Sequence, residues 1–190
     1  MPDEARLIET DGGLEPEREG WFVVNVHDTA WWQSDVFGAS CPFEGNDDEK
    51  RRNTNAADAR FKEYGINIHV VWPGQPNCMY HGEDAQEDFL VLSGECLLLV
   101  EGEERPLKAW DFVHFPNWTE HVIVGAGPGP CAILMVGARG EGRGVRYPVS
   151  EVTQKHGAGV EEETDQPREA YARFPQWQRA TVVDPALPWN

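Results

Sequence analysis

The chain has 190 residues, with 16 Lys and Arg against 33 Asp and Glu, a formal net charge of −17. This acidic balance argues against nucleic acids and anionic membranes as partners, because both attract Lys and Arg. The chain is long enough to bury a core without disulfides. It contains no apolar run of membrane-spanning length, and its N-terminus lacks the basic and apolar regions of a signal peptide. We therefore expect one main folded domain in the cytoplasm.

The first 64 residues differ in character from those that follow. Residues 1–20 are rich in charge and show little periodicity, which predicts a flexible segment. Residues 21–26 are β-branched and aromatic, which predicts a strand. We interpret residues 21–64 as an N-terminal extension that packs on the main domain.

From residue 65 the sequence alternates between short apolar runs and turns that contain Gly or Pro. No helical pattern separates these runs, which favours a β-sandwich or β-barrel. The domain predicted from this pattern covers residues 65–138. The expected strands cover residues 66–72, 88–92, 96–100, 107–115, 121–124 and 131–136, with a short strand or strand entry over residues 77–81.

The pattern of strands stops after Ala138. Ser150 is a candidate cap for a short helix that ends before Gly157, and Pro167 is a candidate start for another. Residues 139–190 contain too few apolar residues for a second core. We interpret them as a C-terminal tail with short helices that packs on the barrel.

Several predicted strands are apolar on both faces. Phe89 and Val91 share one face of their strand, whereas Leu90 and Leu92 share the other. A sheet that is apolar on both faces must be covered on both. The second cover is either the appended segments or another subunit, so a homodimer is one expectation.

Four side chains suggest a metal site. His81 and Glu83 lie two residues apart and point the same way on an extended strand, and Glu87 directly precedes an apolar run. His121 begins a strand after a turn with Pro116. Two imidazoles with one or two carboxylates suit one divalent ion, whether Fe, Mn, Zn, Ni or Co. The alternative is an exposed acidic loop beside unrelated histidines, and spacing alone does not separate the two.

The order of these residues resembles the two motifs of the cupin superfamily. His81-Gly82-Glu83 stands at the HxH of the first motif, followed after three residues by Glu87 and after six more by Gly94. His121 stands at the histidine of the second motif. The resemblance implies an all-β double-stranded β-helix, or jelly roll, whose metal ligands would be His81, Glu83, Glu87 and His121.

Three positions depart from the family pattern. Glu83 replaces the second histidine, which would make the site more negative and favour metals that prefer oxygen ligands. Without Glu83, the other three ligands would form a facial triad with open positions. Trp110 and Trp118 replace glycines, which predicts that those two turns are built differently.

Other residues are candidates for the pocket lining. Asn67 and His69 share one strand face, and Asn77 and Met79 share the parity of His81. Cys78 has the opposite parity and is not expected to be a ligand. The predicted pocket lining is Asn67, His69, Asn77, Met79, Phe89 and Ile123.

The sequence leaves two kinds of function open. The first is a metal-dependent enzyme that acts on a small organic acid or phenolic substrate, by a dioxygenase-like reaction first and an isomerase or lyase reaction second. Here Glu83 is either a metal ligand or a general base. The second is a non-catalytic module that binds or senses a small ligand through the metal.

Overall fold

A computed structural model describes residues 3–45, 59–140 and 144–190, and these residues form mostly β-strands. The strands are β1 (Leu7–Thr10), β2 (Gly13–Pro16), β3 (Trp31–Ser34), β4 (Gly38–Cys41), β5 (Tyr64–Val71), β6 (Gly82–Glu83), β7 (Glu87–Ser93), β8 (Glu95–Val100), β9 (Glu103–Lys108), β10 (Phe112–Phe115), β11 (His121–Gly125), β12 (Cys131–Ala138), β13 (Val145–Arg146) and β14 (Gln178–Ala180). The helices are η1 (Val26–Asp28), α2 (Glu151–Gln154) and α3 (Pro167–Ala170).

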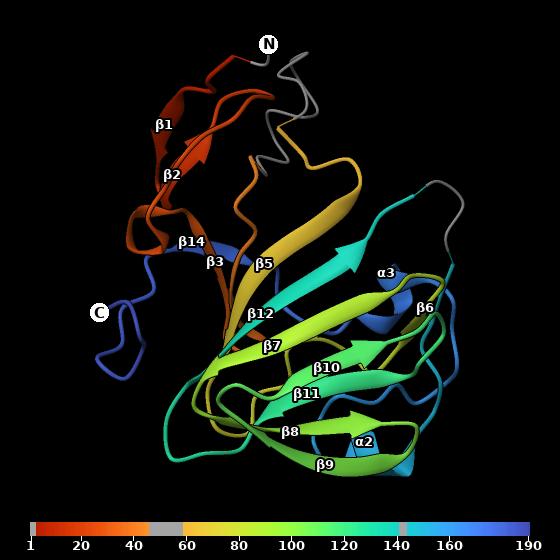
Figure 1. The fold of residues 1–190 in the computed structure, drawn as a ribbon. Helices are drawn as coiled ribbons and strands as arrows, with labels where there is room; N and C mark the ends of the chain where they lie inside the picture. Colours follow the sequence, from red (N-terminus) through yellow and green to blue (C-terminus); the bar gives the residue numbers. More distant parts are fainter. Residues whose placement is uncertain (1–2, 46–58, 141–143) are drawn as a thin grey trace.

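Two antiparallel sheets build the double-stranded β-helix (Figure 1). The large sheet has the order β10-β7-β12-β5-β4-β3-β14, and the smaller sheet has the order β11-β8-β9. Strand β12 pairs with β5 on one side and with β7 on the other. Buried side chains from both sheets, such as Phe89, Leu98 and Ile123, form the core between them. The predicted all-β jelly roll with short C-terminal helices is confirmed.

Most predicted strands of the barrel match observed strands, and one prediction outside it is wrong. Strands β5, β7, β8, β11 and β12 lie where the sequence predicts them. Residues 21–26 do not form a strand: Trp21 makes a single bridge to Glu4, and η1 begins at Val26. This aromatic and β-branched run does not pair with a neighbouring strand. Local propensity cannot predict whether such a partner exists.

The predicted strand over residues 107–115 is two strands in different sheets. Strand β9 ends at Lys108, and β10 begins at Phe112 after a turn in which Trp110 has a φ of 75°. Trp118, in the next turn, has a φ of 67°. Both tryptophans adopt the left-handed conformation that normally favours glycine. Each of the two turns therefore contains a non-glycine residue in a strained backbone conformation.

Replacing Trp110 with Gly is expected to stabilise the protein. The side chain is 74% exposed, so little packing is lost, and a left-handed non-glycine residue costs about 1–2 kcal/mol. The entropy of glycine in the unfolded chain offsets part of this, leaving a gain of about 0.5–1 kcal/mol in the free energy of unfolding. Urea unfolding measures the change. Trp21→Gly, at an exposed position without a positive φ, is the control, and an equal gain there would contradict the explanation.

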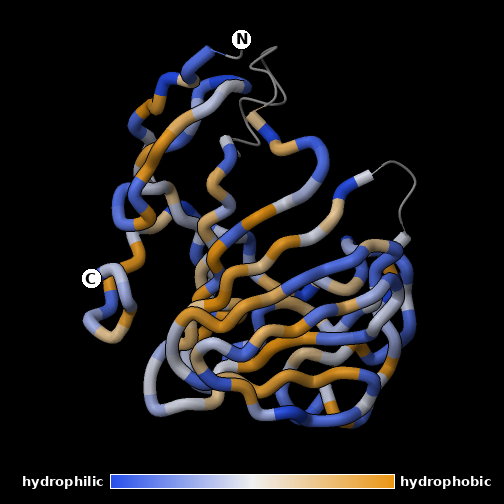
Figure 2. Tube along the Cα trace, in the orientation of Figure 1, coloured by the Kyte–Doolittle hydropathy of each residue, from blue (hydrophilic) through white to orange (hydrophobic). Residues whose placement is uncertain are grey.

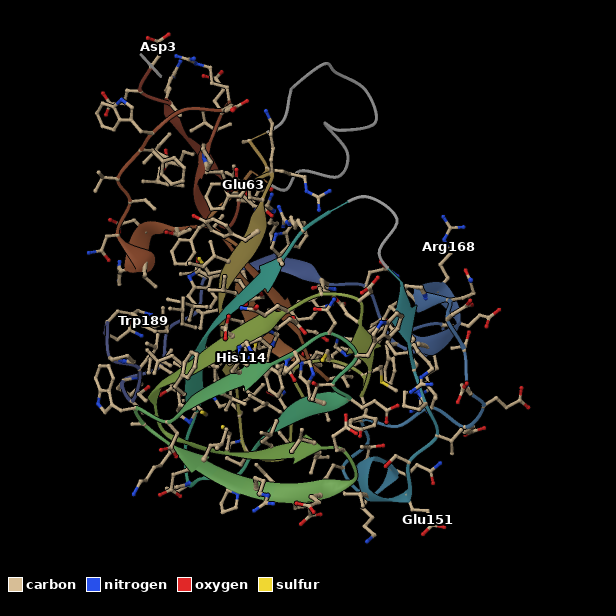
Figure 3. The ribbon with its side chains drawn as sticks, turned by 45° about the vertical axis from the view of Figure 1, so that its right-hand side comes forward. Asp3, Glu63, His114, Glu151, Arg168 and Trp189 are labelled. Carbon is tan, nitrogen blue, oxygen red and sulfur yellow. The ribbon has the colours of Figure 1, made fainter. Side chains whose placement is uncertain are left out.

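Segments outside the central strands cover the outer face of the large sheet. Strands β3, β4 and β14 extend this sheet, and Trp31 packs with Val70 and with Val182, Leu187 and Trp189 of the C-terminal segment. The rings of Trp31 and Trp189 stack with their centroids 5.6 Å apart. Figure 2 shows hydrophobic residues along the strands of the barrel, and Figure 3 places Trp189 beside it. The N- and C-terminal segments thus cover part of the apolar outer face of the large sheet.

The two ends of the chain contain further small elements. Strands β1 and β2 form a hairpin within the segment predicted to be flexible. The helices α2 and α3 lie close to the predicted helical positions, and Gly157 after α2 has a φ of 70°. In the part of the chain that the structure describes, no helix is both long and apolar enough to cross a membrane.

Candidate metal site

The main chain holds the two candidate histidine ligands side by side. The N–H of His121 donates to the carbonyl oxygen of His81 over 2.9 Å, and the N–H of His81 donates back to His121 over 3.3 Å. His121 begins β11, and His81 directly precedes β6. This antiparallel bridge brings together two residues that are 40 positions apart in the chain, with ring centroids separated by 5.3 Å.

Each imidazole is oriented by a backbone carbonyl. Nδ1 of His81 lies 2.7 Å from the carbonyl oxygen of Met79, and Nδ1 of His121 lies 2.9 Å from that of Thr119. A carbonyl only accepts, so Nδ1 is the nitrogen that carries the proton when either ring is neutral, and Nε2 then carries the lone pair. Metal-binding histidines are commonly oriented in this way by a hydrogen bond from the other ring nitrogen. Phe115 stacks on His121, with centroids 3.9 Å apart, and further fixes the ring.

Glu87 faces His121 from the first residue of β7. Its Oε2 lies 3.2 Å from Nε2 of His121. Gly137, the partner of Glu87 on β12, leaves room for the carboxylate, because a Cβ atom at Gly137 would lie 3.2 Å from Oε1. The backbone of β12 therefore helps to set the position of this side chain.

Three of the four predicted ligands form a compact group. One donor atom from each of His81, Glu87 and His121 lies within 4.8 Å of the others. Glu83 stands at the margin of the group: its Oε1 is 3.4 Å from Nε2 of His81, and its side chain is 41% exposed. The backbone carbonyl of Glu83 accepts a hydrogen bond from the N–H of Trp118, so the strained turn fixes β6 here.

The surroundings of His81 favour positive charge. Burial disfavours the imidazolium form, but the neighbouring Cys78 and Glu83 outweigh this effect and raise the pKa of His81 well above its ordinary value. Hydrogen bonding and charge both contribute to the effect of these two neighbours.

The group opens on a pocket of about 320 Å³. Of the residues predicted to line it, Asn67, His69, Asn77 and Phe89 do so. Met79 is fully buried and packs instead with Phe37, Tyr147, Val160 and Ala170. Ile123 is also fully buried, in the core between the sheets.

Cys78 and Arg139 also line the pocket, although the sequence did not point to them. Sγ of Cys78 lies 3.7 Å from Nδ1 of His81. Residues 77–80 are not in a strand, so the alternation that argued against Cys78 does not apply. Arg139 follows β12, and only the pairing of β12 with β5 and β7 brings it near Gly65 and the pocket.

His69 is expected to make stability depend on pH. Burial lowers its pKa to about 4, and its Nε2 lies 2.7 Å from the carbonyl oxygen of Phe37. The unfolded chain binds a proton near pH 6.5 and the folded chain only near pH 4, so stability is full above the first value and is lost as pH falls. We expect a loss of about 2 kcal/mol between pH 7 and pH 5.

Urea unfolding of the native protein and of His69→Gln at both pH values measures this effect. The variant should show a pH dependence that is weaker by that amount. An equal dependence in the two proteins would rule out His69 as its source.

A comparison with family models agrees with the jelly-roll fold that holds this histidine–carboxylate group. Residues 67–137 match the family model described as the cupin domain. These residues form a cupin domain. They contain β6 to β11 and most of β5 and β12, and therefore His81, Glu87 and His121. A search of curated proteins found no match to the chain.

Solved structures with a similar fold include three bacterial proteins. A sugar phosphate isomerase of the cupin superfamily from Silicibacter pomeroyi has 18% identity and a TM-score of 0.51, over 65% of this chain and 79% of that one. The polyketide cyclase RemF from Streptomyces resistomycificus has 14% identity and a TM-score of 0.48, over 62% and 79%. A predicted oxalate decarboxylase from Thermotoga maritima has 21% identity and a TM-score of 0.47, over 62% and 98%. The similarity to the Silicibacter pomeroyi protein, at 18% identity, shows the fold alone.

Proposed function

We propose that the cupin domain binds one divalent metal ion through His81, Glu87 and His121. The observation that carries this proposal is the convergence of three donor atoms within 4.8 Å, with both imidazoles oriented by backbone carbonyls. Two imidazoles and one carboxylate suit Fe, Mn, Zn, Ni or Co, and three protein ligands leave coordination positions open.

We propose further that the site is catalytic and acts on a small organic acid or phenolic substrate. A metal with open positions supplies Lewis acidity or activates dioxygen. A dioxygenase-like reaction is the first candidate, and an isomerase or lyase reaction is the second. Glu83 lines the pocket with a partly exposed carboxylate, so it is placed to take a proton from a substrate as a general base.

One observation favours the alternative of a non-catalytic module that binds or senses a small ligand. Oε1 of Glu83 lies 3.4 Å from Nε2 of His81, the same nitrogen that the metal would use. If Glu83 turned inward as a fourth ligand, the site would be closed and would suit a structural zinc ion. The role of Glu83 therefore separates the two functions.

Metal analysis and turnover together test the proposal. The protein is purified without a metal-chelating column, and its metal content is measured by elemental analysis. It is then loaded separately with each divalent ion and given organic acids and phenols, with dioxygen uptake and product formation as readouts. We expect about one metal ion per chain and turnover of at least one substrate class. The Glu83→Gln variant should keep its metal and lose turnover.

The outcomes distinguish the two functions. Metal binding without turnover by any loaded form would favour the binding module, as would loss of metal in Glu83→Gln. A protein that takes up no divalent ion would overturn both functions.

We also propose a homodimer, because several strands are apolar on both faces. Light scattering coupled to size-exclusion chromatography measures the mass in solution. A mass equal to that of one chain at micromolar concentration would contradict the dimer.

A further inference from the structure

Asn67 presents a polar atom with an unmet hydrogen bond at the candidate site. The residue lies on β5, pairs with Met135 of β12, and lines the same pocket as His81, Glu87 and His121. Its Oδ1 is buried and has no hydrogen-bond partner among the described residues. A buried acceptor without a partner carries the cost of its lost hydration, so its presence needs an explanation.

The neighbouring polar side chains of the pocket are already engaged. Oδ1 of Asn77 accepts from the N–H of Ile123 over 2.8 Å, and Nδ2 of Asn77 lies 3.7 Å from the sulfur of Met135. Nε2 of His69 donates to the carbonyl of Phe37. The amide of Asn77 therefore stabilises the fold through its hydrogen bonds. Oδ1 of Asn67 makes no such hydrogen bond among the described residues.

The charges of the pocket favour a neutral ligand. Apart from the histidines, which would bind a metal ion in their neutral form, its charged lining residues are Glu83, Glu87 and Arg139. Both guanidinium Nη atoms of Arg139 already bind the two carboxylate oxygens of Glu44, over 2.8 and 2.5 Å. The charge of a divalent ion would balance the two remaining carboxylates, so a ligand needs no charge of its own.

The apolar part of the lining suits an aromatic ring. Phe89 and Met135 lie opposite each other on β7 and β12, and both line the pocket. Aromatic and thioether side chains make favourable contacts with the face or edge of a ring. The pocket volume, about 320 Å³, lies at the lower end of the range for small-molecule sites.

We propose that Asn67 is a substrate-binding residue, whose Oδ1 accepts a hydrogen bond from a hydroxyl group of a neutral phenolic ligand. The proposal rests on the metal site proposed above, which would hold a second oxygen of the same ligand. The terminal amide of Asn rotates easily about its last torsion, so the oxygen can turn toward a ligand in the pocket. The need for a neutral ligand with a hydroxyl donor favours the phenolic class over the organic acids. Within that class it favours a ligand with two adjacent hydroxyl groups.

Binding of catechol and of 2-methoxyphenol tests the proposal. Both offer one hydroxyl group to the metal, but only catechol has a second hydroxyl group to donate. The zinc-loaded protein and its Asn67→Leu variant are titrated with each compound by calorimetry without oxygen. We expect the variant to bind catechol about tenfold more weakly, the effect of one hydrogen bond. Its affinity for 2-methoxyphenol should be unchanged.

Thermal unfolding of the metal-free proteins supplies the matched control. Asn67→Leu removes an acceptor that has no partner, so its melting temperature should be equal to or higher than that of the native protein. Asn77→Leu removes an amide that the fold uses, so its melting temperature should be lower. The same substitution is thus expected to lower the melting temperature at Asn77 but not at Asn67.

Three results would overturn the role of Asn67: catechol binding that is unchanged in the variant, no binding of either compound to the zinc-loaded native protein, or destabilisation by Asn67→Leu as large as that by Asn77→Leu. The zinc content is measured first. A native protein without zinc would overturn the metal site and the subsite together, whereas a loaded protein that fails the catechol test overturns the subsite alone.

Discussion

His121→Ala is expected to remove metal binding from the protein. The imidazole is 2% exposed, directs Nε2 toward Glu87, and supplies one of the three donor atoms of the group. Loss of even an outer partner of a metal ligand typically weakens binding by about 10–100-fold, so loss of a ligand should exceed about 100-fold. Elemental analysis after dialysis should show about one ion per chain in the native protein and almost none in the variant.

A second histidine of the barrel provides the matched control. His114 on β10, labelled in Figure 3, is about half exposed. It pairs with Asp88 over 2.7 Å. His114→Ala should retain the metal content of the native protein. If His121→Ala also retained it, the three-residue group could not be the metal site.

Arg139→Met is expected to cause the largest loss of stability. Glu44, which Arg139 binds through both oxygens, is only 5% exposed, and the same Arg also donates to the carbonyl of Phe61 over 2.6 Å. Without the guanidinium, the carboxylate would remain buried with its charge uncompensated. Breaking a buried ion pair in this way costs about 3 kcal/mol in the free energy of unfolding. Urea unfolding at neutral pH measures the loss.

Arg105→Met tests whether burial is the reason for this effect. Arg105 pairs with Glu103 on β9, and both side chains are mostly exposed. An exposed pair contributes about 0–1 kcal/mol, so this variant should remain close to the native protein. Equal losses in the two variants would show that the environment of Glu44 is not decisive.

The central strands could be predicted because each contains its own signal. Strands β5, β7, β8, β11 and β12 are apolar runs bounded by turn residues, and such runs mark strands whatever their partners. Residues 107–115 could not be divided in the same way, because the turn between β9 and β10 places Trp110 where glycine is usual. Composition therefore gave no sign of a break.

The convergence of the candidate ligands could be predicted because they follow a motif, whereas the pocket lining depends on tertiary pairing. His81, Glu87 and His121 occupy motif positions and converge in the structure. The positions of Met79 and Cys78 were inferred from strand alternation in a stretch that is not a strand. Arg139 reaches the pocket through the pairing of β12 with β5, which no local pattern encodes.

The main-chain pairing of His81 with His121 sets the spacing of the two imidazoles through the backbone alone. If the site binds the proposed ion, it would lose and regain that ion without refolding, so a chelator should empty it reversibly. The fixed distance between the two imidazoles would also make the site selective for ionic radius, because ions of different radius need different metal–ligand distances. Ion selectivity would then be a property of the backbone, and substitutions on the outer surface of the barrel would leave it unchanged.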